Sequence, residues 1–195
     1  MASASPVRES PLQPDNWIQA AFLRLTAQGV EAVRIEILAR DLGATKGSFY
    51  WHFKDREELL SRMLIQWEGE EIQWLEAERE AHSGAAARWA RFVERSANAD
   101  RARLEVSFRA WARRDDVIAS HVAAIEARRR AHIVSVLRDV GFNPSTADKW
   151  SEIAMLVHLG WMDRATRDPG FRLSGRGLGE FLSDLILAAS APADH

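Results

Sequence analysis

The stretch GATKGSFYWHFKDREELL, residues 43–60, decides the fold of this chain. Four aromatic side chains, Phe49, Tyr50, Trp51 and Phe53, crowd into five positions directly after a glycine and a small polar run. At about 100° per residue on a helical wheel, Phe49 and Phe53 point inward together, and the residues around them lie on other faces. The pattern therefore predicts a short helix with one aromatic face for a core and an N-terminal end that is small, polar and basic.

Two short helices are predicted to meet at Gly43 and Ala44. Apolar residues at helical spacing fill 35–42, and Thr45 can cap a following helix that runs to about Phe53. A glycine-containing turn between two short helices is the helix-turn-helix arrangement, whose second helix enters the major groove of DNA. A plain helical hairpin has the same pattern, so the spacing alone leaves both interpretations open.

The residues around this second helix suit contact with DNA. Gly47 lets a backbone approach closely, Thr45 and Ser48 supply hydroxyl groups, and Lys46 offers a donor for a guanine edge or a phosphate. Further donors follow along the helix and at the next helix start, at Tyr50, Trp51, His52, Lys54 and Arg56.

Helical periodicity also describes the flanking segments of the N-terminal part. The first helix is expected to start with Asp15 as its N-cap and to end at Gly29. A long fourth helix is predicted over 55–80, because Asp55 and Glu58 fit a start like a capping box.

Five more helices are predicted in the rest of the chain, so the fold class is all-α with about nine helices. No strand pattern and no internal repeat is found in the sequence. Ser145 or Thr146 is expected to open the eighth helix. The expected breaks after the fourth helix lie at 82–84, 115–116, 141–144 and 168–170.

Composition limits the function classes. The 195 residues are 47% hydrophobic, carry a formal net charge of -2 and include no cysteine, which excludes disulfides, thiolate metal sites and cysteine nucleophiles and suits a cytoplasmic protein. No apolar run reaches the roughly 18 residues of a membrane helix, and residues 1–13 read as a disordered tail without the apolar region of a secretory signal. No phosphate loop, nucleophile elbow or metal-ligand spacing is present, so neither an enzyme nor a cofactor is predicted.

Residues 15–64 resemble the N-terminal domain of the TetR family of bacterial transcriptional regulators. Ala21, Phe22 and Gly29 match the end of the family's first helix. The family's pattern over the second and third helices is matched at Gly43, Thr45, Ser48, Phe49, Tyr50, His52, Phe53, Arg56 and Leu59. The resemblance covers about a quarter of the chain. It implies a helix-turn-helix DNA-binding domain over 14–60 and a helical ligand-binding and dimerisation domain over 61–190.

The resemblance also implies roles for single residues. Thr45, Lys46, Gly47 and Ser48 match positions that approach bases or flanking phosphates, and Tyr50, Trp51, His52, Lys54 and Arg56 match phosphate-contacting positions.

Two departures from the family pattern stand upstream of these residues. Val33 and Arg34 occupy the start of the second helix, where the family usually has Thr or Ser, so Arg34 is expected to take over a phosphate contact. Glu36 stands where some relatives carry a base-contacting arginine, and we expect it to pair with Arg40 at i+4.

Aromatic side chains concentrate after residue 60, where they either fill the core or line a pocket. Indole groups are awkward to bury completely, and several of them on converging helices can line a ligand site. The resemblance implies such a pocket among the fourth to eighth helices, with a ligand that shifts the fourth helix. The candidate lining residues are Trp67, Trp89, Phe108, Trp111, Ile125, Arg129, Met155, His158 and Met162.

Two of these candidates have a structural alternative. Arg129 stands at an apolar position of the seventh helix, so it either pairs with an anionic ligand or extends to the surface or to a structural carboxylate. His158 lies on an apolar stripe and is either a core histidine or a ligand contact.

The last two helices carry apolar faces. These faces pack inside one subunit or, as the resemblance implies, form a four-helix interface with a second copy. The candidate interface residues are Ile153, Leu156, Val157, Gly160, Trp161, Leu178, Phe181, Leu182 and Leu185.

The expected function is that of a homodimeric transcriptional regulator, most simply a repressor released from a palindromic double-stranded DNA operator by a small apolar or aromatic molecule. The alternative is a DNA-bound factor on the same fold whose helical domain contacts another protein and takes no small-molecule effector.

Overall fold

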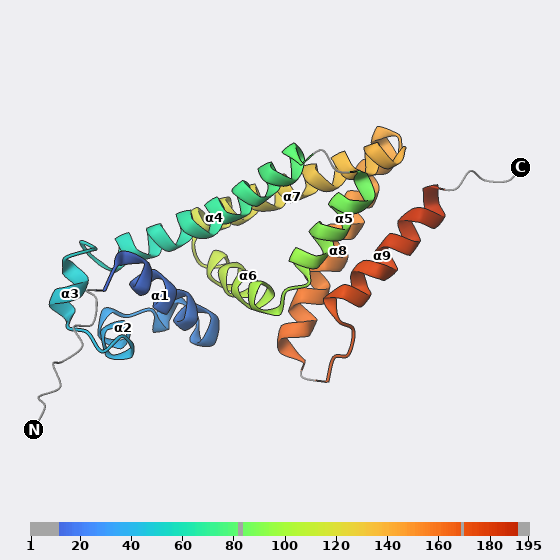
Figure 1. Cartoon of the computed structure of the whole chain (residues 1–195). Helices are drawn as coiled ribbons and strands as arrows, with labels where there is room; N and C mark the ends of the chain where they lie inside the picture. The colour runs from blue at the N-terminus through green and yellow to red at the C-terminus, as the bar shows by residue number, and fades with distance from the viewer. Residues whose placement is uncertain (1–11, 82–83, 169, 191–195) are drawn as a thin grey trace, which may run out of the picture. The chain divides into compact units, whose positions relative to one another are not determined.

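The computed structural model describes residues 12–81, 84–168 and 170–190, with side chains described up to 186, and the predicted all-α class is confirmed (Figure 1). Most of the tail expected at 1–13 lies outside these residues. The helices of the described residues are α1 (Pro14–Gln28), η1 (Val30–Ala32, a 3₁₀ turn), α2 (Ile35–Asp41), α3 (Lys46–Tyr50), α4 (Arg56–Glu80), α5 (Ala85–Ser96), α6 (Ala99–Ala112), α7 (Asp116–Val140), α8 (Pro144–Arg167) and α9 (Gly175–Ser190).

The chain divides into two compact units, and the boundary lies between Ile65 and Gln66, within α4. The family resemblance implies an end of the first domain at residue 60. Each unit has its own buried core, so each is described by itself.

The core of the first unit is aromatic. The Phe49 ring lies edge-on to Trp17 at 5.3 Å between centroids and stacks on Phe53 at 5.2 Å. All three side chains are buried, together with Leu38 and Leu59. The inward pairing of Phe49 and Phe53 that the helical wheel predicted is therefore confirmed.

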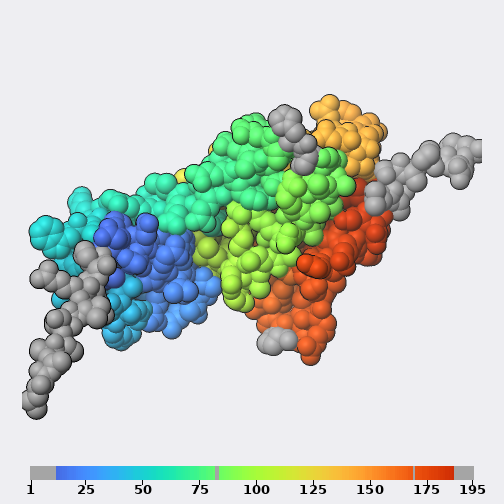
Figure 2. All heavy atoms as spheres, in the orientation of Figure 1, coloured from blue at the N-terminus to red at the C-terminus, as the bar shows by residue number. Residues whose placement is uncertain are grey.

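The core of the second unit joins α5 to α9. Trp89 and Phe92 of α5 meet apolar residues of α7, α8 and α9, including Ile133, Met162 and Leu182. Figure 2 shows the green surface of α5 meeting the red and orange surface of α8 and α9 along the visible face. Several residues of this core also line the cavity among α5, α8 and α9 that is described below.

Caps define most helix starts. The side chain of Thr45 accepts a hydrogen bond from the backbone N–H of Ser48 (3.2 Å), and Asp55 accepts from the N–H of Glu58 (2.8 Å), as expected. Two predicted N-caps are wrong by one or more residues. The cap of α1 is Gln13, because Pro14 already occupies the first turn, where its missing N–H costs nothing.

The second wrong cap is at α8, whose cap is Asn143, again with a proline directly after it. The Asn143 side chain accepts from the N–H of Thr146 at 2.9 Å. Ser145 and Thr146, which were expected to open the helix, lie inside its first turn.

Candidate nucleic-acid interface and effector domain

The turn between α2 and α3 fixes where α3 begins. Gly43 has φ = 62°, in the left-handed region that a residue with a Cβ adopts only at a cost. The N–H of Ala44 donates to the carbonyl of Ala39 at 2.8 Å, which closes the end of α2. Thr45 then caps α3, and Phe49 anchors it in the core.

The outward side of α3 is polar and aromatic. Tyr50 is 56% exposed and Trp51 is 87% exposed, an unusual state for two large rings in sequence. Thr45, Lys46, Gly47 and Lys54 are exposed as well, and Ser48 and His52 are half-buried. The structure thus brings eight of the ten predicted DNA-binding residues onto or beside the outer side of one short helix.

Lys46 does not stand free at this end of α3. Its Nζ lies 2.7 Å from Oε1 of Glu36 on α2, and both side chains are exposed. The hydrogen bond from Lys46 lowers the pKa of Glu36, and the same bond raises the pKa of Lys46. The predicted pairing of Glu36 with Arg40 is therefore wrong: the partner comes from the next helix, across the turn.

The two remaining predicted residues are arginines with backbone partners. Arg34 is exposed, and its Nε donates to the carbonyl of Glu31 at 2.9 Å. Arg56 is half-buried, and it donates through Nε to the carbonyl of Val33 (2.6 Å) and through Nη2 to that of Val30 (2.7 Å). Arg56 therefore ties the start of α4 to the segment before α2, which differs from the phosphate contact predicted for it.

The predicted effector pocket is occupied by its own side chains. Trp67 stacks on Phe108 with 4.2 Å between ring centroids and an interplanar angle of 15°. Trp67, Phe108, Ile125, Met155 and Met162 are all buried in the core of the second unit.

The other aromatic candidates are placed differently. Trp89 is buried, and its Nε1 donates to Oγ of Ser183 at 2.6 Å. Trp111 is half-buried beside Phe108, with 6.0 Å between ring centroids. In this conformation, Trp67, Phe108 and Trp111 stack on one another instead of opening a shared space.

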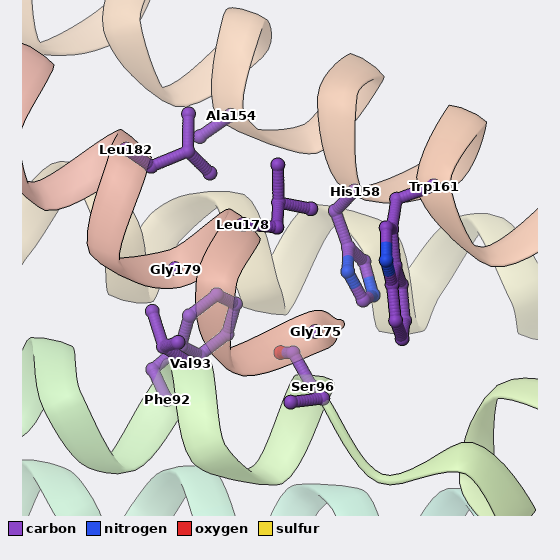
Figure 3. Close-up of a pocket in the computed structure, with 11 residues that line it drawn as sticks. Phe92, Val93, Ser96, Ala154, His158, Trp161, Gly175, Leu178, Gly179 and Leu182 are labelled. Atoms are coloured by element: carbon purple, nitrogen blue, oxygen red, sulfur yellow. The ribbon is translucent and has the colours of Figure 1, made fainter. Parts of the chain in front are cut away.

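A small cavity of about 30 Å³ lies among α5, α8 and α9, and His158 is the one predicted pocket residue that lines it. Figure 3 shows the His158 and Trp161 rings side by side on α8, facing Ser96 and Gly175. This cavity is lined by Phe92, Val93, Ser96, Ala97, Ala154, His158, Trp161, Gly175, Leu178, Gly179 and Leu182.

Burial governs the charge of His158. It lowers the pKa of the imidazole from 6.5 to about 4, against the opposing pull of the Glu105 carboxylate. The ring is therefore neutral near pH 7.

Arg129 joins three helices through buried ion pairs. Its Nε lies 2.7 Å from Glu71 on α4, and its Nη1 lies 2.6 Å from Glu105 on α6. Burial works against charge on Glu105, but Arg129 and Arg109 outweigh it and lower the pKa of Glu105 to about 2. The structural alternative for Arg129, a carboxylate partner, is the one found.

The residues predicted for the dimer interface differ in how far the protomer itself buries them. Trp161, Leu178 and Leu182 are buried within the protomer, where they line the cavity next to α5. Val157 is half-buried. The group on the protomer surface consists of Ile153, Leu156, Gly160, Phe181 and Leu185.

No described helix is long and apolar enough to cross a membrane. No group of three or more His, Asp or Glu side chains among the described residues is arranged to hold a metal ion.

Comparisons with known proteins match the first unit by sequence and the chain by fold. Residues 18–63 match the model described as bacterial regulatory proteins, tetR family. The chain is 40% identical over 47 residues to the uncharacterized HTH-type transcriptional regulator TtgW of Pseudomonas putida. The match spans 24% of this chain and only 35% of that relative.

Solved structures extend the likeness in fold to most of the chain. A putative transcriptional regulator from Saccharomonospora viridis, solved in complex with choline, has a TM-score of 0.74 and 19% identity over 89% of this chain and 95% of its own. A transcriptional regulator from Rhodococcus sp. Rha1 has a TM-score of 0.71 and 18% identity over 91% and 95%. Residues 18–63 therefore match the DNA-binding domain of the tetR family of bacterial regulatory proteins, and the fold of the chain resembles that of solved transcriptional regulators over about nine-tenths of its length.

Proposed function

We propose that the chain is a homodimeric repressor that binds a palindromic DNA operator and is released by a small apolar or aromatic molecule. The observation that carries the proposal is the outer side of α3. A five-residue helix holds Tyr50 and Trp51 out of the core while Phe49 is fully buried. Exposing two rings is unfavourable in water, so a partner surface is the simplest reason for it.

DNA fits this surface by shape and by chemistry. Thr45 and Gly47 open the helix with small groups that admit a base edge, and Tyr50 offers a phenolic donor for a phosphate. Trp51 packs its indole against a sugar or donates Nε1–H to a phosphate. Arg56 is not assigned to DNA here, because its guanidinium group is held by two carbonyl groups.

Dimerisation follows from the need to reach two half-sites. Recognition helices in a two-fold dimer meet half-sites about 34 Å apart, or a multiple of that distance. The exposed apolar residues of α8 and α9, notably Leu156 and Phe181, provide a surface for that contact. The structure of similar fold from Saccharomonospora viridis is a complex with choline, which supports a small-molecule partner for this chain.

A second candidate function is a DNA-bound factor whose helical domain contacts another protein. The filled core favours it, because Trp67 stacks directly on Phe108 and the cavity beside His158 measures about 30 Å³. The two functions share the DNA-binding domain and differ in whether a small molecule changes DNA affinity.

Fluorescence anisotropy with the palindromes upstream of the gene tests the leading function. We expect one palindrome to bind at least about tenfold more tightly than random DNA of equal length. Lys46→Ala and Tyr50→Ala should weaken this complex, while Arg113→Ala, an exposed arginine after α6, should leave it unchanged. Equal binding to every palindrome and to random DNA would refute sequence-specific recognition.

The pair between Lys46 and Glu36 yields a sharper test of the same interface. Glu36→Gln removes a negative charge that faces the phosphates and frees Lys46 to neutralise one of them. The slope of log K against log salt should therefore steepen by about one. Glu31→Gln, an exposed acid on η1, is the matched control. An unchanged slope for Glu36→Gln would show that Lys46 makes no phosphate contact.

A further inference from the structure

We propose that a groove between α4, α5 and α7 of the second unit binds a small aromatic or apolar molecule that carries a carboxylate or phosphate group. The groove measures about 270 Å³, and no residue of the predicted effector pocket lines it. Its lining residues are Ile72, Leu75, Glu76, Arg79, Arg88, Arg128, Ala131, His132 and Ser135.

The charged groups of the groove are mostly basic. Arg79, Arg88 and Arg128 line it against one acid, Glu76, and His132 adds an imidazole. Arg79 is exposed and has no ion-pair partner within 12–81, 84–168 and 170–190. Arg128 is also exposed, with its Nη1 3.3 Å from Glu68. The two guanidinium groups are therefore accessible to an anion entering from solvent.

Arg88 lies deeper in the groove. Its side chain is more than nine-tenths buried, and its Nη1 is 2.5 Å from Asp139. Its Nη2 donates to Oγ of Ser135 at 3.1 Å. Buried arginine is uncommon unless each of its donors has a partner.

Two buried nitrogen atoms beside the groove lack such partners. Neither Nε of Arg88 nor Nε2 of His132 makes a hydrogen bond within the described residues, although both residues are more than nine-tenths buried. An unsatisfied buried polar atom costs free energy, and an oxygen acceptor in the groove reaches these two nitrogen atoms once the Arg88 and His132 side chains turn toward it. A carboxylate or phosphate supplies several such oxygens, and arginine recognises both groups through paired hydrogen bonds.

The apolar wall and the volume of the groove indicate what the uncharged part of the ligand is. Ile72, Leu75 and Ala131 give the groove an apolar side next to its basic side. An apolar cavity of about 150 Å³ accepts benzene. A groove of 270 Å³ therefore has room for a ring of that size with one anionic substituent. A lone inorganic anion would leave the apolar side in contact with water.

The proposal rests on the proposed function only in calling this ligand an effector, because binding itself needs no DNA. Isothermal titration calorimetry on the full chain therefore measures it directly. We choose benzoate, phenyl phosphate and benzyl alcohol as probes, which share a ring and differ in the anionic group. Benzoate or phenyl phosphate should bind at millimolar concentration or below, and benzyl alcohol at least about tenfold more weakly.

Variants locate the bound anion. Arg79→Gln and Arg128→Gln should each weaken binding of the preferred anion by about fivefold, since each removes one exposed charge-assisted contact. Arg167→Gln, which changes an exposed arginine on α8, should bind like the wild type. A preference for benzoate or for phenyl phosphate identifies which oxyanion the groove takes, and either order supports the site.

Three results would overturn the site: no binding of either anion, benzyl alcohol binding as tightly as the anions, or wild-type affinity in both groove variants. DNA is absent from these titrations. A failure of sequence-specific DNA binding therefore refutes the proposed function and leaves the ligand site standing. A failure of the titrations refutes the ligand site and leaves the DNA-binding function standing.

Discussion

At the scale of single residues, Arg129 shows how one side chain organises the core of the second unit. It is buried with two carboxylates, Glu71 and Glu105, that are buried as well. Burial opposes the charged form of Glu71, yet Arg129, Arg95 and Arg101 together hold its pKa below the ordinary value. Each charge is tolerated because the others are present.

Removing Arg129 should therefore be costly. Arg129→Met leaves Glu71 and Glu105 in the core without their shared partner, and we expect the free energy of unfolding at pH 7 to fall by about 3–5 kcal/mol. Urea denaturation followed by circular dichroism measures the change. Arg130→Met, at the half-exposed neighbouring position, should cost less than about 1 kcal/mol. A similar loss for both variants would contradict the buried-network account.

His158 makes stability depend on pH in a defined window. Its pKa is about 4 in the folded chain and 6.5 in the unfolded chain, so the unfolded state binds more protons between these values. The free energy of unfolding should thus fall by about 2 kcal/mol as pH drops from 7.5 to 5. Glu105 titrates below this window when folded.

The His158→Asn variant isolates this contribution, because the pKa of His132 is also lowered by burial and acts in the same direction. Urea titrations at several pH values should show a shallower dependence for the variant. Equal slopes for variant and wild type would assign the dependence to other groups.

At the scale of elements, the contact of α9 with α5 depends on two glycines one turn apart. A Cβ added to Gly179 would lie 1.7 Å from Cγ1 of Val93, and one added to Gly175 would lie 2.5 Å from Cα of Ala97. Both distances are too short for real atoms, so the backbone of α9 packs directly on the Val93 side chain of α5 and on Ala97 after it.

Gly179→Ala should therefore force the two helices apart and destabilise the second unit by about 1–3 kcal/mol. Gly69→Ala is the matched control, because a Cβ there meets nothing within 4 Å. That substitution in the middle of α4 should stabilise the chain by up to about 1 kcal/mol through helix propensity alone. Thermal unfolding distinguishes the two, and stabilisation by Gly179→Ala would disprove the close contact.

At the scale of the whole molecule, substitution of an exposed apolar residue of α8 or α9 tests whether this surface forms the proposed dimer interface. Phe181→Glu places a charge on that surface at a side chain that is 57% exposed. The variant should be folded, monomeric by sedimentation and at least about tenfold weaker on a palindrome, since half-site avidity is lost. Val117→Glu, equally exposed at the start of α7, should stay dimeric. A dimeric Phe181→Glu variant would move the interface elsewhere.

Prediction from sequence succeeded where neighbours in the chain decide the structure. Phe49 and Phe53 share a face because of helical spacing, and Thr45 caps α3 from the adjacent position. It failed for Glu36, whose partner Lys46 lies on another helix, since i+4 spacing says nothing of partners across a turn. Gly179 was missed for the same reason: its neighbour Val93 is far away in the chain, and only the one-turn spacing from Gly175 hinted at a close contact.

Residues on the apolar faces of the last two helices were the hardest to assign. Apolar residues at helical spacing mark a helix face, but not whether a second copy or the protomer's own core covers it. Leu182 and Phe181 are adjacent in sequence and equally apolar, yet one is buried against α5 and the other is on the surface. Only the arrangement of α9 on α5 separates them.

The exposure of Trp51 also gives the protein a built-in optical reporter. Of the eight tryptophans, the other seven are buried or half-buried, and Trp51 is 87% exposed. Collisional quenchers such as iodide reach an indole in proportion to its exposure, so most of the quenchable emission should come from this one ring. Loss of iodide quenching of the protein's own fluorescence should therefore report, in real time, when a partner such as DNA covers Trp51.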